Sequence, residues 1–234
     1  MAAGGGTAAA VVEQLRAHQD DCELEKVRAR LAPDDDAIGL RMRDLFDIAK
    51  GNEGLPLDEV DRLLDHPTYE ARMAAMCILD FQARRRLEDR DRRSLYDLYL
   101  ERHDRITTWD MVDRAAPRVV GGYLAGRSLD PLRQLAGSSD RLRRRTAITA
   151  PLYFVRYGTE RDIAESFDVA GLLADDPDPT VSRAVGIFLK HAGTKDAAAL
   201  MAFLDAHAAT LPRPALRLAV EKLGPSERAR YHAS

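Results

Sequence analysis

Apolar residues recur three and four positions apart along almost the whole chain, and strict alternation of apolar and polar residues is nearly absent. That spacing gathers apolar side chains on one face of a helix, whereas a half-buried strand needs a period of two. Short breaks with Gly, Pro, Asp or Ser separate the helical stretches. The pattern predicts an all-α protein with helices at Ala8–Gln19, Cys22–Leu31, Leu40–Lys50, Pro56–Leu64, Tyr69–Arg86, Glu88–Glu101, Trp109–Ala116, Pro117–Leu124, Asp130–Leu135, Asp140–Tyr157, Thr159–Phe167, Thr180–His191, Asp196–Ala208 and Pro212–Leu223.

Four segments of the chain repeat one arrangement: turn residues, a polar helix start, small residues and then larger apolar residues. They begin at His66, Ile106, Ser138 and Asp178. Their alignment gives equivalent positions, about 37 residues apart, to Arg72, Trp109, Arg145 and Arg183. This period is close to that of helix-pair repeats from the tetratricopeptide to the HEAT kind. We therefore expect a right-handed α-solenoid of HEAT-like helix pairs with a concave groove.

Composition is that of a globular protein, with 45% apolar and 31% charged residues. No linker-like stretch divides the chain, so we expect one domain over residues 7–234 after a disordered tail over residues 1–6.

The net charge of −3 gives no global basic field, although a local basic groove is compatible with it. Cys22 and Cys77 form neither a disulfide framework nor a metal-ligand spacing. With no apolar run of membrane-spanning length, these features indicate a cytoplasmic protein.

The stretch Ile106–Gly122 holds the only tryptophan of the chain. Thr107 or Thr108 can cap a helix that starts there. Trp109 and Asp113 are then one turn apart on a single helix face. An aromatic ring beside a carboxylate suits a ligand site, and the alternative is that Trp109 is a core anchor.

In the aligned repeats, Asp113 and Ile187 occupy equivalent positions. The strip of residues that we expect to line the concave groove carries four arginines, which are Arg72, Arg144, Arg145 and Arg183. Guanidinium groups that converge on a groove suit a phosphate backbone. A carboxylate among them is repelled by phosphate but stabilises the cationic sugar of an N-glycosidic cleavage. The alternative is that the arginines are solvated surface charges paired with Asp140, Glu70 or Asp178.

The chain resembles the HEAT-like-repeat alkylpurine DNA glycosylases of the AlkD type, the DNA alkylation repair enzyme family, over nearly its whole length. The resemblance runs from AIGLRMRDLFDIAK (37–50) through HPTYEARMAAMCIL, TTWDMVDRAAPRVVGGYL, RRRTAI, RAVGIFLKHAGTKD and FLDAHAATLPRPALRLAVEKL to the terminal RARY. Its most specific parts are the Trp-Asp-x-Val-Asp segment at Trp109 and the Pro-Arg-x-x-Leu-Arg segment at Pro212.

This resemblance implies that Trp109 and Asp113 face the damaged nucleotide and that Asp113 stabilises its positive charge as the glycosidic bond breaks. It implies that Arg145 contacts the DNA backbone and that the damaged base is not pulled into a pocket. It also implies that the protein needs no metal or organic cofactor and is a monomer. The chain departs from the family at Ile187 and Leu142, where relatives usually carry tryptophan. Loss of the aromatic wall at Ile187 removes roughly 1–3 kcal/mol of stacking, which weakens cleavage or changes which lesion fits.

The sequence thus predicts a monofunctional glycosylase of base excision repair, acting on N3- or N7-alkylated purines in duplex DNA, with bulky adducts as a further class. Its predicted catalytic residues are Asp113 and Trp109. Its predicted DNA-binding residues are Arg145, Arg144, Arg183, Arg72 and Ile187, and it is expected in the cytoplasm at the nucleoid. Two alternatives stay open: a non-catalytic paralogue that binds damaged or branched DNA, and a HEAT-like protein scaffold, against which the arginine strip argues.

Overall fold

The structure is a computed structural model that describes residues 6–33 and 35–232. The predicted tail lies outside these residues except for Gly6, which is exposed before the first helix. The described residues form helices and loops without a strand, apart from an isolated bridge between Asp36 and Thr68. The all-α prediction is confirmed, whereas the handedness and the concave groove stay predictions. No helix in the described ranges is long and apolar enough to cross a membrane.

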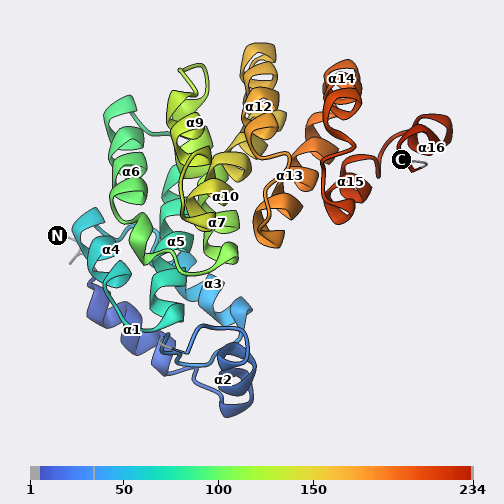
Figure 1. The fold of residues 1–234 in the computed structure, drawn as a ribbon. Coiled ribbons are helices and arrows are strands. Elements are labelled where there is room, and N and C mark those ends of the chain that lie inside the picture. The colour runs from blue at the N-terminus through green and yellow to red at the C-terminus, as the bar shows by residue number, and fades with distance from the viewer. Residues whose placement is uncertain (1–5, 34, 233–234) are drawn as a thin grey trace. The chain divides into compact units, whose positions relative to one another are not determined.

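The chain divides into two compact units, one up to Ala115 and one from Ala116 on. The expectation of a single domain stays a prediction. The first unit contains α1 (Ala8–Arg16), α2 (Asp21–Arg28), α3 (Met42–Gly51), α4 (Leu57–Leu64), α5 (Tyr69–Ala83), α6 (Asp89–Glu101), η1 (His103–Arg105) and α7 (Trp109–Ala116), whose last residue belongs to the second unit (Figure 1).

Helix α5 is the centre of the first unit and is buried along almost its whole length. It packs against α1, α3, α4 and α6, and its small residues Ala71, Ala74 and Ala75 let neighbouring helices approach closely. The Glu70 carboxylate on α5 accepts hydrogen bonds from the backbone N–H groups of Ile38 at 2.8 Å and Gly39 at 2.9 Å. These bonds hold the loop that leads into α3 against the central helix.

The second unit is a run of shorter helices in which α13 is central. α13 packs against α10 and α15, and two fully buried aromatics, Phe154 and Phe188, fill the core of this unit. Its elements are η2 (Pro117–Gly121), α8 (Gly122–Leu124), α9 (Asp130–Ala136), α10 (Arg141–Thr149), η3 (Ala150–Tyr153), α11 (Phe154–Tyr157), α12 (Glu160–Leu172), α13 (Pro179–Ala192), α14 (Ala197–His207), α15 (Arg213–Ala219) and α16 (Pro225–His232).

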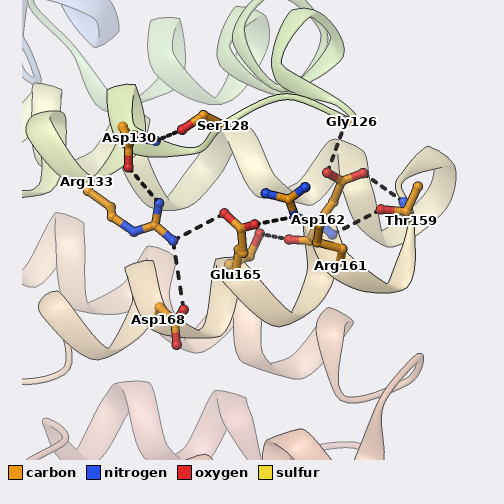
Figure 2. A network of polar contacts seen from close by, with 10 residues as sticks. Gly126, Ser128, Asp130, Arg133, Thr159, Arg161, Asp162, Glu165 and Asp168 are labelled. Carbon is orange, nitrogen blue, oxygen red and sulfur yellow. Dashed lines mark hydrogen bonds and ion pairs between the residues drawn. The ribbon is translucent and has the colours of Figure 1, made fainter.

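A polar network fixes the start of α12 in the second unit. Figure 2 shows Thr159 and Asp162 in a reciprocal capping arrangement, in which each side chain accepts a hydrogen bond from the other residue's backbone N–H. Asp162 also accepts from the N–H of Gly126 at 3.0 Å, and Gly126 has a φ of 74° that favours glycine. Glu165, one turn into the helix, accepts from Arg133 of α9 at 3.2 Å. The network thus ties the loop before α9 and α9 itself to α12.

The helices predicted at Trp109–Ala116 and Pro117–Leu124 form one continuous helical run. Pro117 lacks an N–H and its ring crowds the preceding turn, so the α-helical bond cannot form there. The run instead widens into the π-helical segment η2 and then returns to α-helix in α8. The predicted helix Asp140–Tyr157 has the opposite irregularity, since it tightens into the 3₁₀ segment η3, which contains Pro151.

Close packing at η2 leads to a first testable prediction. A Cβ on Gly121 would lie 2.2 Å from the carbonyl oxygen of Ala150, a backbone atom that cannot move aside alone. Gly121→Ala is therefore expected to lower the free energy of unfolding by about 1–3 kcal/mol, measured by urea denaturation. The matched control is Gly122→Ala, because that Cβ meets only the ring of Tyr153 at 3.5 Å. Equal losses in the two variants would contradict this packing argument.

Candidate functional site

Helix α7 presents Trp109 and Asp113 on its exposed side. It buries Met111, Val112 and Ala115 completely, whereas the Trp109 side chain is 51% exposed and Asp113, one turn later, is partly exposed. Trp109 is therefore not a core anchor. A large aromatic ring and a carboxylate therefore lie one turn apart, and both are accessible to solvent. The ring can stack on a base or sugar, which then lies next to a negative charge.

The start of α7 is not held as the sequence predicts. The hydroxyl of Thr107 accepts a hydrogen bond from Arg72 Nη2 at 3.3 Å, and the buried hydroxyl of Thr108 has no partner within the described part of the chain. Neither threonine caps the helix, so the capping prediction is wrong. Thr107 bonds Arg72, which is 35 residues away in the sequence, and no local pattern contains such a long-range contact.

Asp110 anchors the first turn of α7. Its Oδ2 accepts hydrogen bonds from the Tyr69 hydroxyl at 2.7 Å and from Arg30 Nη1 at 2.8 Å. Arg30 Nη2 donates in turn to the Tyr69 oxygen at 3.0 Å, and the Arg30 guanidinium lies 4.8 Å from the centre of the Tyr69 ring. Burial raises the pKa of Tyr69, and the charge of Asp110 raises it further. The phenol therefore stays protonated and keeps donating to the carboxylate.

Arg114 anchors the next turn of α7. Its Nη2 lies 3.0 Å from Oδ2 of Asp80, a fully buried carboxylate on α5. Its guanidinium also lies 4.8 Å from the ring centre of Phe46 and 4.7 Å from that of Phe81, an arrangement that favours a cation between two aromatic faces. Burial raises the pKa of the neighbouring Cys77 thiol to about 12, so this cysteine stays protonated at neutral pH.

Sequence reasoning did not single out these anchors. Asp110 and Arg114 are one turn apart on the strip next to Trp109 and Asp113, and that spacing was a usable signal. The partners Arg30 and Tyr69 come from distant segments, and no local pattern could have identified them.

Arg72, predicted to bind DNA, is bonded within the first unit. Its side chain is only 9% exposed and forms an ion pair with Asp35. It also donates to the carbonyl of Pro67 at 2.9 Å and to Thr107. These contacts hold the chain segments around the start of α5 and the entry to α7.

Arg144 and Arg145 are likewise bonded within the second unit. Arg144 binds Asp176 through two contacts, from Nε to Oδ2 at 2.6 Å and from Nη2 to Oδ1 at 3.2 Å. The Arg145 side chain is almost fully buried and donates to the backbone carbonyl of Thr180. Both arginines thus join the start of α10 to the segment at the start of α13. The acid that pairs with Arg144 is none of those considered from the sequence.

Arg183 and Ile187 lie one turn apart on α13. Arg183 is exposed, and no hydrogen bond or ion pair engages it within the described ranges, while Ile187 is partly exposed. Of the four arginines predicted to bind DNA, Arg183 is thus the one whose donors are open to solvent. Trp109, Asp113 and Arg72 belong to the first unit, and Arg144, Arg145, Arg183 and Ile187 belong to the second.

Comparison with known proteins identifies the family. A family model described as DNA alkylation repair enzyme matches residues 11–223, which is most of the chain. The structure is similar to that of a predicted DNA alkylation repair enzyme from Enterococcus faecalis, with a TM-score of 0.64, 13% identity, and coverage of 89% of this chain and 98% of that chain. At this identity the likeness shows a shared fold, and no curated protein matches the chain. The chain belongs to the DNA alkylation repair enzyme family.

Proposed function

We propose that this protein is a monofunctional DNA glycosylase that hydrolyses the N-glycosidic bond of N3- or N7-alkylated purines in duplex DNA, as a step of base excision repair. The observation that carries the proposal is the pair of exposed Trp109 and partly exposed Asp113 on α7, in a chain of the DNA alkylation repair family. The protein acts as a monomer in the cytoplasm, at the nucleoid, and needs no metal or organic cofactor.

The chemistry requires one carboxylate and no general acid. When the bond between C1′ and the purine nitrogen breaks, the electron pair goes to the purine, whose positive charge it neutralises, so the base leaves without protonation. The sugar is left as an oxocarbenium-like cation, which the Asp113 carboxylate stabilises by its charge. Water then adds to C1′ and loses a proton to solvent. Trp109 covers the damaged nucleotide and shields the reacting centre from bulk water.

The four arginines have two roles: one contacts the DNA directly, and the other three support the helix ends that carry the site. Arg183 contacts phosphate oxygens directly, since its guanidinium is exposed. Arg144 and Arg145 shape the helix starts of α10 and α13 on which the DNA backbone lies, and Arg72 supports the entry to α7. Ile187, which is partly exposed one turn from Arg183 on α13, belongs to the same proposed DNA-binding surface of the second unit.

The test is base release from duplex DNA that contains N7-methylguanine or N3-methyladenine, with an undamaged duplex of the same sequence as control. DNA binding is measured on the same samples at two salt concentrations. Release from the alkylated duplexes alone supports the glycosylase. The absence of release under enzyme excess contradicts it.

A second candidate function is a non-catalytic paralogue that binds damaged or branched DNA. Ile187 favours this candidate, because the wall that stacks on the lesion in relatives lacks an aromatic ring here. Salt-dependent binding without base release in the same experiment would favour this second function.

Removal of Arg183 is expected to weaken DNA binding without loss of stability. Arg183→Ala should lower affinity about equally for all DNA sequences and reduce the slope of log affinity against log salt by about one, because one phosphate contact is lost. Binding of labelled duplex DNA over a salt series measures this slope. Arg86→Ala, which removes an exposed arginine after α5, is the control and should leave the slope unchanged. An unchanged slope in Arg183→Ala would mean that Arg183 contacts no phosphate.

A further inference from the structure

Helix α7 carries two neighbouring strips with different surroundings. Trp109 and Asp113 form the partly exposed strip, and Asp110 and Arg114, each one residue later, form a strip that is bonded into the first unit. Successive residues of an α-helix are about 100° apart around the axis, so a rotation of α7 that moved Asp113 would also have to pull Asp110 and Arg114 from their partners.

The contacts around Asp110 form a closed cycle. Tyr69 donates to Asp110, and Arg30 donates both to Asp110 and to Tyr69, with distances of 2.7, 2.8 and 3.0 Å. Asp110 is mostly shielded, with 15% of its side chain exposed, whereas 41% of the Arg30 side chain is exposed. Shielded ion pairs of this kind add little net stability compared with apolar packing, but they fix the relative positions of the groups that they join. The chemistry proposed above uses none of the three groups directly.

We propose that Arg30, Tyr69 and Asp110 form a positioning cluster that fixes the first turn of α7 and thereby the orientation of Trp109 and Asp113 for base release. This inference rests on the proposed glycosylase function. Asp110 is the residue directly after Trp109, and neither preceding threonine caps the helix, so the cluster supplies the constraint that a cap would otherwise give. Electrostatic stabilisation of a developing cation depends on a carboxylate held in place before the reaction.

The test variant is Tyr69→Phe, which removes the hydroxyl but keeps the ring under Arg30. We expect single-turnover base release to fall about ten- to a hundredfold, the range for small displacements of reacting groups, while DNA affinity stays near that of the wild type. Trp109, the only tryptophan, reports on the same turn. Its fluorescence anisotropy should fall and its quenching by acrylamide should rise in Tyr69→Phe without DNA.

The matched control is Tyr231→Phe on α16. The Tyr231 side chain is almost fully buried and its hydroxyl donates to Asp205 at 2.7 Å, so the variant loses the same kind of hydrogen bond within the second unit. It should leave base release and Trp109 fluorescence unchanged. Arg30→Ala, with Arg28→Ala at the end of α2 as its control, gives a second test pair, because both residues are exposed. Arg30→Ala should lower base release and the fluorescence anisotropy of Trp109, whereas Arg28→Ala should change neither.

Unchanged release and fluorescence in both Tyr69→Phe and Arg30→Ala would overturn the proposal. An equal loss of release in Tyr69→Phe and Tyr231→Phe would also overturn it, because the effect would then be one of general stability. If the wild type releases no base, the proposed function fails. The fluorescence comparison still decides whether the cluster fixes Trp109.

Discussion

Asp113→Asn is expected to lower single-turnover base release by about a hundred- to a thousandfold while the protein folds normally. The amide has the shape of the carboxylate but no charge, so the variant loses the interaction that forms only as the sugar becomes cationic. Removal of one preorganised electrostatic group of an active site typically has an effect of this size. DNA binding should be unchanged or slightly stronger, since a negative charge that repels phosphate is gone.

The measurement is release of N7-methylguanine with enzyme in excess over DNA, so that the chemical step is seen apart from product release. Asp104→Asn is the matched control, because Asp104 is an exposed acid on η1 that forms an ion pair with its neighbour Arg105 at 3.3 Å. It should behave as the wild type does. Full activity of Asp113→Asn would refute the assigned role of the carboxylate.

Arg144→Ala is expected to lower the free energy of unfolding by about 3–5 kcal/mol, the usual result of breaking a buried ion pair. The Asp176 side chain is only 4% exposed, so its charge would be left shielded from water and unpaired. Urea denaturation at neutral pH measures the loss. Arg143→Ala is the control, because that side chain is 36% exposed and lies 4.0 Å from Asp140. Its effect should stay within about 0.5 kcal/mol.

A double-mutant cycle separates support from DNA contact. If Arg144 mainly stabilises the fold through Asp176, Arg144→Ala and Asp176→Ala will be strongly non-additive. If Arg144 were mainly a phosphate contact, its removal would leave the unfolding free energy nearly unchanged and reduce the salt slope of DNA binding.

The helical period predicted the fold class and most of the helices, because each amphipathic stretch carries its own signal. It did not predict α16, whose segment is short and polar. The pattern predicts that a new helix starts at Pro117, yet the run continues across it through a π-helical turn. Proline removes one backbone bond, and whether a helix then ends or widens depends on what packs against it, which a local pattern does not contain.

The repeat alignment placed Arg72 and Arg183 in equivalent positions, but one is buried and the other is exposed. A period tells which face of a helix a residue occupies, whereas its burial depends on the partner across the fold. Asp35 is 37 residues from Arg72, and Asp176 is 32 residues from Arg144. These pairings are long-range, so sequence reasoning could propose the arginines as a group but could not separate supporting residues from exposed ones.

The division into two units has a consequence for how such an enzyme can diversify. The contacts described for Asp110 and Arg114 come from Arg30, Tyr69 and Asp80, all in the first unit, so that unit supplies these constraints on the helix that carries Asp113. Arg183 and Ile187 belong to the second unit. Substitutions without shared partners act nearly independently. Under the proposed function, substitutions at Arg183 or Ile187 would therefore change which DNA is accepted and leave the constraints on α7 in place. Substrate range and chemistry are then separately evolvable traits of one chain.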